Sequence, residues 1–159
     1  MNAVTINAVM EIVEEDHRLV LDKTRALKEA VECLMVPGDK GLREALSQLQ
    51  RLNQYFASHF AAHTEEEERV MFPFLEQHSP AGCDIVAALK CQHVEIRGKR
   101  EEFGKCLDVA DELEGGPPRM VLADLVSYGL ELWDVLDSHA REETHAVHRC
   151  IVPLLAGRE

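Results

Sequence analysis

The sequence lacks any apolar run of about 20 residues, the length that a membrane-spanning helix needs. It also has no basic segment ahead of an apolar one near Met1, so we expect no secretory signal and a cytoplasmic protein. Basic residues are few: 17 lysines and arginines stand against 29 aspartates and glutamates, which gives a formal net charge of −12. Such a charge repels phosphate backbones and anionic lipid surfaces, so we expect neither a nucleic-acid nor a membrane partner.

Cysteine is present, but not in a pattern that suggests disulfides or a zinc knuckle. The five cysteines are odd in number and no two share a CxxC spacing. We expect them to be small core residues, which is how unpaired cysteine usually behaves. Their positions are Cys33, Cys83, Cys91, Cys106 and Cys150.

Proline and glycine are scarce except in three clusters, "VPGDK" at 36–40, "HSPAG" at 78–82 and "EGGPP" at 114–118. Between the clusters, apolar residues recur every three or four positions, which is the helical period, and no strand-type alternation occurs. With 159 residues, 46% of them hydrophobic, the chain can bury one sizeable core. We therefore predict an all-α fold, an up-down-up-down antiparallel four-helix bundle, as a single domain over 1–159. The helices should cover about 5–35, 40–77, 80–113 and 117–155, and Pro73 should kink or end the second.

Histidine and glutamate interrupt the apolar stripes at positions where the helical period requires a buried residue. In the second helix three of them are spaced i, i+4 and i+8 and therefore share nearly one face. We expect seven side chains to point into the bundle: His17, His59, His63, Glu67, His93, His139 and Glu143.

The turn positions predict that these side chains lie at a similar height. In an antiparallel pair, residues equidistant from the connecting turn lie side by side. His17 and His59 have their midpoint at residue 38, inside the first turn cluster. Glu67 and His93 have theirs at 80, and His93 and His139 at 116, inside the other two clusters. All four helices should thus bring ionisable groups to one level.

A metal centre explains this convergence better than a set of separate polar residues. A single inward histidine is more often a hydrogen-bonded core residue, and acidic runs such as Glu65–Glu68 are usually solvated. Seven unpaired buried groups, however, would each cost about 1–3 kcal/mol. Imidazole with carboxylate and no thiolate suits iron, manganese or zinc. Because one zinc ion needs only four ligands, seven candidates favour two ions, with Glu67 and Glu143 able to bridge them and one position open for a small anion or diatomic gas.

Four short motifs resemble the hemerythrin-like family of HHE cation-binding domains. They are "DHRLVL" around His17, "HTEEEERVMFP" from His63, "QHVEIR" around His93 and "HAREE" around His139. The resemblance implies a four-helix bundle that holds two iron ions, as Fe2+ or Fe3+, with a bridging oxo or hydroxo group, five histidines and two bridging carboxylates. Zinc and manganese are the alternative metals.

The resemblance also implies several functions, because members bind dioxygen, sense iron, respond to nitric oxide or help to repair damaged iron centres. We favour a non-haem di-iron protein that binds or senses O2 or NO. The alternatives are iron storage or donation, with an iron–sulfur protein as the partner, and a ferritin-like iron oxidase, since Glu14–His17 and Glu142–His145 both read ExxH. A purely structural bundle would hold no metal. Whether the chain is an enzyme stays open, but we favour a metal- and gas-binding protein over a dedicated enzyme; the oligomeric state is not predicted. A dry pocket could be lined by Phe56, Phe60, Ile96 and Trp133.

Overall fold

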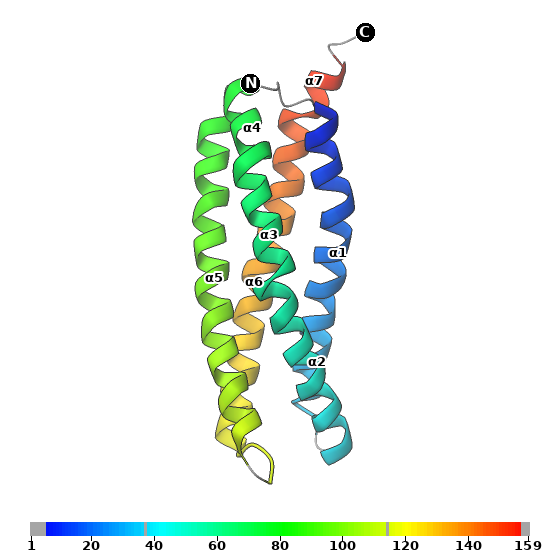
Figure 1. Cartoon of the computed structure of the whole chain (residues 1–159), viewed down its shortest axis with the longest axis vertical. Helices are drawn as coiled ribbons and strands as arrows, with labels where there is room; N and C mark the ends of the chain where they lie inside the picture. The colour runs from blue at the N-terminus through cyan, green and yellow to red at the C-terminus, as the bar shows by residue number, and fades with distance from the viewer. Residues whose placement is uncertain (1–5, 37, 114, 157–159) are drawn as a thin grey trace.

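The chain folds into four antiparallel helical rods in the computed structural model (Figure 1). The structure describes residues 6–36, 38–113 and 115–156, with the backbone alone for Glu15, Asp16, Asp39 and Leu155. The first rod is α1 (Ile6–Cys33), the third is α5 (Gly82–Glu112), and the fourth is α6 (Arg119–Cys150) with the short α7 (Val152–Ala156). The second rod consists of α2 (Asp39–Ala57), α3 (His59–Glu66), the π-helical turn η1 (Glu67–Met71) and α4 (Phe72–His78). The predicted all-α bundle is confirmed, and the described ranges contain no strand.

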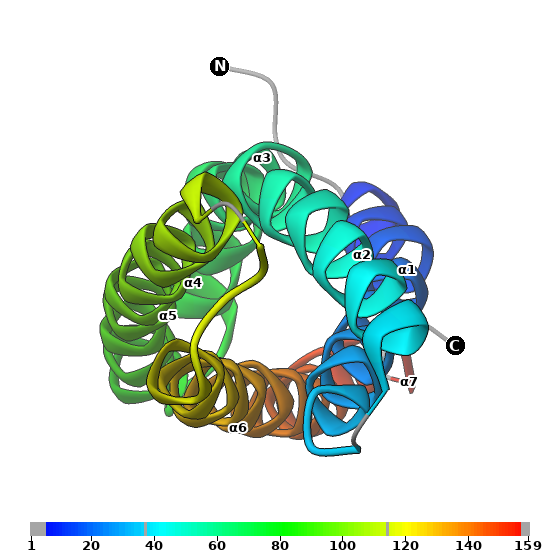
Figure 2. The same ribbon diagram turned by 90° about the horizontal axis from the view of Figure 1, so that it is seen from below.

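The rods surround a common axis, as the view along the bundle shows (Figure 2). The first rod lies between the second rod and α6, and α5 lies between α6 and the second rod. Each rod therefore turns one stripe toward the axis, the arrangement that the apolar periodicity predicts. Within the described ranges, no helix is both long and apolar enough to cross a bilayer.

The buried apolar side chains form two clusters that are separated along the axis. One lies toward the α2 end and includes Val20, Leu27, Leu49, Phe56, Phe103, Leu132 and Leu136. The other lies toward α4 and α7 and includes Val9, Val13, Met71, Phe72, Leu89, Val147 and Ile151. Burying a side chain of this size contributes about 1.5–3 kcal/mol, so both ends of the bundle are held together by hydrophobic packing. In every rod, the inward histidines lie between the two clusters.

The second rod remains helical through Pro73, which we expected to kink or end it. The backbone N–H of Phe72 bonds to the Glu67 carbonyl, five residues earlier, so the helix widens by one residue before the proline. Pro73 has no N–H to donate, and α4 continues beyond it to His78. The wider turn changes which residues face inward: Met71 is buried after Glu67, while Val70, three residues after Glu67 on a regular helix face, is only half-buried.

The connection between the second and third rods is unusually close. The Gly82 N–H donates to the Ser79 carbonyl oxygen at 3.0 Å. A Cβ atom at position 82 would lie 2.0 Å from the carbonyl oxygen of Leu75, so only glycine fits there. This turn sets the register of the two rods that carry Glu67 and His93.

The cysteines do not all lie in the core. Cys150 is buried and Cys106 is half-buried, but Cys33, Cys83 and Cys91 are exposed. The expectation that all five are core residues was wrong for these three, because their helical phase places them outward despite apolar neighbours in sequence. All five are free thiols, in agreement with the predicted lack of disulfides.

Candidate metal centre

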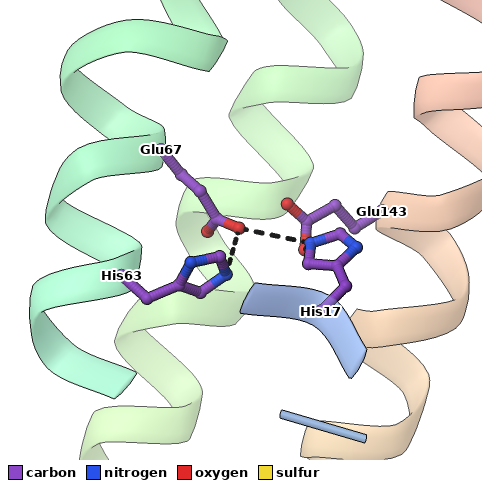
Figure 3. A group of neighbouring side chains, drawn as sticks. All are labelled: His17, His63, Glu67 and Glu143. Carbon is purple, nitrogen blue, oxygen red and sulfur yellow. Dashed lines mark ion pairs between the residues drawn. The ribbon is translucent and has the colours of Figure 1, made fainter. Parts of the chain in front are cut away.

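Six of the seven predicted side chains meet between the two hydrophobic clusters. Each rod contributes: α1 carries one, the second rod carries one in α3 and one at the start of η1, α5 carries one and α6 carries two. Five of the six are buried, and the histidine from α1 is partly exposed. The six are His17, His63, Glu67, His93, His139 and Glu143. Figure 3 shows four of them, from three rods, pointing toward one another.

The first group consists of His17, His63, Glu67 and Glu143, and one potential ligand atom from each lies within 4.8 Å of the others. Glu67 Oε1 is 2.6 Å from His63 Nε2 and 3.5 Å from His17 Nε2 (Figure 3). Glu143 Oε2 is 3.0 Å from His17 Nε2. Two imidazoles and two carboxylates thus surround one point.

The second group consists of Glu67, His93 and His139, within the same limit of 4.8 Å. Here the other carboxylate oxygen is used: Glu67 Oε2 is 3.2 Å from His93 Nε2. Glu143 Oε2 also lies 3.3 Å from His139 Nε2. Both carboxylates therefore contact histidines of both groups, Glu67 with one oxygen toward each group and Glu143 with Oε2 alone.

Several buried nitrogen and oxygen atoms of the six clustered residues have no hydrogen-bond partner within the protein. Among the described residues, seven buried side-chain nitrogen or oxygen atoms lack a hydrogen-bond partner of good geometry, and six of them belong to this centre. They are Nε2 of His17, His93 and His139, both Glu67 oxygens and Glu143 Oε1. Each such atom costs about 1–3 kcal/mol unless something binds it. A cation would satisfy all six, so the residues present fit a metal.

Without a cation, protons on the histidines would balance the negative charge of the carboxylates in this centre. Burial alone would lower the pKa of His17, but the Glu143 and Glu67 carboxylates outweigh it and raise that pKa to about 10. Burial likewise opposes protonation of His63 and His93, yet Glu67 raises the pKa of each. Burial would raise the pKa of Glu67, but its contacts with His17, His63 and His93 hold it well below its usual value. A metal ion would therefore have to displace protons at neutral pH.

The structure does not bring His59 to the other six residues. It is exposed on the outside of α3, where its ring stacks on Tyr55 at 5.8 Å and its Nδ1 lies 3.3 Å from Ser58 Oγ. The helix is interrupted at Ser58, and the inward position one turn before His63 is taken by the buried Phe60. The spacing of four residues therefore did not suffice to place His59 on the inner face.

Three polar residues that the sequence did not single out as part of the centre support its histidines from outside. His93 Nδ1 lies 2.8 Å from Glu68 Oε1, and His139 Nδ1 lies 2.8 Å from Gln92 Oε1. Gln92 Nε2 in turn donates to Glu142 Oε2. We expected Glu68 to be solvated, as acidic runs usually are, and the only signal for Gln92, Glu68 and Glu142 is that each is next to a predicted ligand in sequence.

The comparison with known families agrees with this geometry. A family model described as the hemerythrin HHE cation binding domain matches residues 8–151. The chain belongs to this family. Comparisons with curated proteins and with solved structures gave no match. Membership in this family implies cation binding, and the His/Glu cluster of the HHE domain is where the described residues could hold a cation.

The ExxH pairs that suggested a ferritin-like site do not assemble into one. Glu14 is exposed on α1, and Glu142 and His145 are both exposed on α6. His148 is exposed as well, as its position on the helix predicts. Only His17 from these pairs points into the HHE centre.

Proposed function

We propose that the six clustered residues hold two iron ions and that the protein binds or senses a diatomic ligand, O2 or NO. The observation that carries the proposal is the pair of overlapping groups that share Glu67. His17 and His63 would hold one ion, and His93 and His139 the other. Glu67 and Glu143 would bridge them, since each contacts histidines of both groups.

The donor set supports iron with room for an additional ligand. The nitrogens of four histidines and the oxygens of two carboxylates would be shared between the two ions, which would leave coordination positions free. Imidazole and carboxylate ligands with open positions are typical of non-haem iron that reacts with oxygen. When bound, reduced iron supplies electrons to a diatomic ligand. The chain itself contributes fixed positions for the ligand atoms, two negative charges and an apolar surrounding.

Two cavities border residues of the centre, which supports binding of a small molecule there. One, of about 10 Å³, is bordered by His17, His63 and His139 and walled by Val20 and Phe60, so it has the room of about one water molecule.

The other cavity, of about 390 Å³, runs between the second rod and α5 and reaches His93. Glu65, Arg97 and Arg100 also line it, so it is not the dry pocket that we expected. Phe56, Phe60 and Ile96 line it, as the sequence suggested. Trp133 does not. It packs on the hydrophobic cluster toward the α2 end, with the Lys28 Nζ 4.2 Å from its ring centre.

The test is an optical titration of the iron-loaded protein after anaerobic reduction. Adding O2 or NO to the reduced protein should produce a charge-transfer band with one ligand bound per chain. Phe60→Trp, which would fill the small cavity, should weaken ligand binding while two ions remain bound. A protein that holds two ions but gives no spectral change with either gas would contradict the gas-binding role and favour iron storage or donation.

A further inference from the structure

A chain of hydrogen bonds connects the protein surface to His139. Glu142 is exposed on α6, Gln92 is half-buried on α5, and His139 is buried. Gln92 Nε2 donates to Glu142 Oε2, and Gln92 Oε1 lies 2.8 Å from His139 Nδ1. The last atom in this chain, His139 Nε2, faces the centre, where Glu143 Oε2 lies 3.3 Å away but no hydrogen bond is formed.

The chemistry of each group fixes the direction of these bonds. An ionised carboxylate can only accept, so Glu142 requires the NH2 group of Gln92 to face it. The Gln92 carbonyl must then face His139, where it can only accept the proton of Nδ1. A neutral imidazole with its proton on Nδ1 has its lone pair on Nε2, which is the atom that points at the metal centre.

We propose that Glu142 and Gln92 are positioning residues that select the metal-binding tautomer of His139. The inference rests on the proposed metal centre, because the selected lone pair is useful only if a cation binds there. His93 is held differently, since its Nδ1 meets the Glu68 carboxylate directly at 2.8 Å. Because the two ends of the Gln92 amide differ, rotating that amide by half a turn would present its NH2 group to His139 Nδ1 instead of its C=O group.

The substitution Glu142→Lys tests this reversal at a residue that touches no metal ligand atom. A lysine can only donate, so it would draw the Gln92 carbonyl toward itself and turn the NH2 group toward His139. Nδ1 would then have to accept, and the proton would move to Nε2, where it blocks the metal. We expect zinc affinity, measured by chelator competition, to fall about 10- to 100-fold.

Three matched variants separate this effect from charge alone. Glu142→Gln keeps an acceptor oxygen and should bind zinc like the wild type. Glu95→Lys makes the same charge change on α5 at an exposed residue for which no pairing is found within the described residues, and it should have little effect. In a Gln92→Ala background, Glu142→Lys should cause no further loss, because the connecting amide is gone.

The tautomer itself is read from the 15N shifts of His139, in zinc-loaded protein and in metal-free protein at a pH where the ring is neutral. The wild type should carry the proton on Nδ1, and Glu142→Lys should carry it on Nε2. An unchanged tautomer in Glu142→Lys, or an affinity loss that persists in the Gln92→Ala background, would overturn the inference. If the tautomer changes as expected between the wild type and Glu142→Lys but neither binds zinc, Glu142 and Gln92 control the tautomer and the proposed metal centre is what fails.

Discussion

Replacing Glu67 with glutamine should remove metal binding from both halves of the centre. Glu67 Oε1 faces His17 and His63, while its Oε2 faces His93, so this one side chain serves both groups. Glutamine keeps the shape but loses the charge and one acceptor oxygen. Loss of a residue that only hydrogen-bonds to a metal ligand typically costs 10- to 100-fold in metal affinity. For the shared ligand we therefore expect a loss greater than about 100-fold, measured by chelator competition with zinc or iron.

The matched control is His59→Ala in the same rod. Because His59 is exposed and stacks on Tyr55, its removal should leave the metal content unchanged. Circular dichroism should show the same helical content in both variants. If Glu67→Gln still bound two ions, or if His59→Ala lost one, the assignment of ligands would be wrong.

Metal removal should lower the thermal stability strongly. At a free metal concentration about 1,000 times the Kd, binding stabilises the folded state by about 4 kcal/mol. For a chain of this size, each kcal/mol shifts the melting temperature by about 2–4 °C. We therefore expect chelation to lower the Tm by roughly 8–16 °C, followed by circular dichroism, while the Glu67→Gln variant should hardly respond.

The difference in Tm between the metal-loaded and the metal-free protein should grow as the pH rises. In the metal-free protein the pKa of His17 is raised from 6.5 to about 10, so its protonated ring adds stability below pH 6.5. That contribution is lost as the pH rises toward 10, while proton competition with the metal weakens over the same range. A Tm difference that narrows between pH 6.5 and pH 9 would contradict this account of the charges.

The helical period was enough to predict the bundle and most of the inward residues. His17, His93 and His139 lie where an apolar stripe is interrupted, and burial of such a stripe dictates their direction. The turn positions likewise predicted that these residues share one level, because the rods are antiparallel and their connections short.

Other features depend on backbone details that periodicity does not carry. The interruption at Ser58 leaves His59 outside, and the π-helical turn after Glu67 buries Met71 in place of Val70. The supporting roles of Glu68 and Gln92 depend on contacts between rods, which no single helix reveals. Such contacts follow from how the rods are packed together.

The most direct test of the metal centre is the metal content of the purified, iron-reconstituted protein, measured by mass spectrometry against protein concentration. The proposal predicts two iron ions per chain, because two groups of ligand atoms share Glu67. One ion per chain would contradict the bridged pair. No bound iron would mean that the six converging side chains do not form the proposed site.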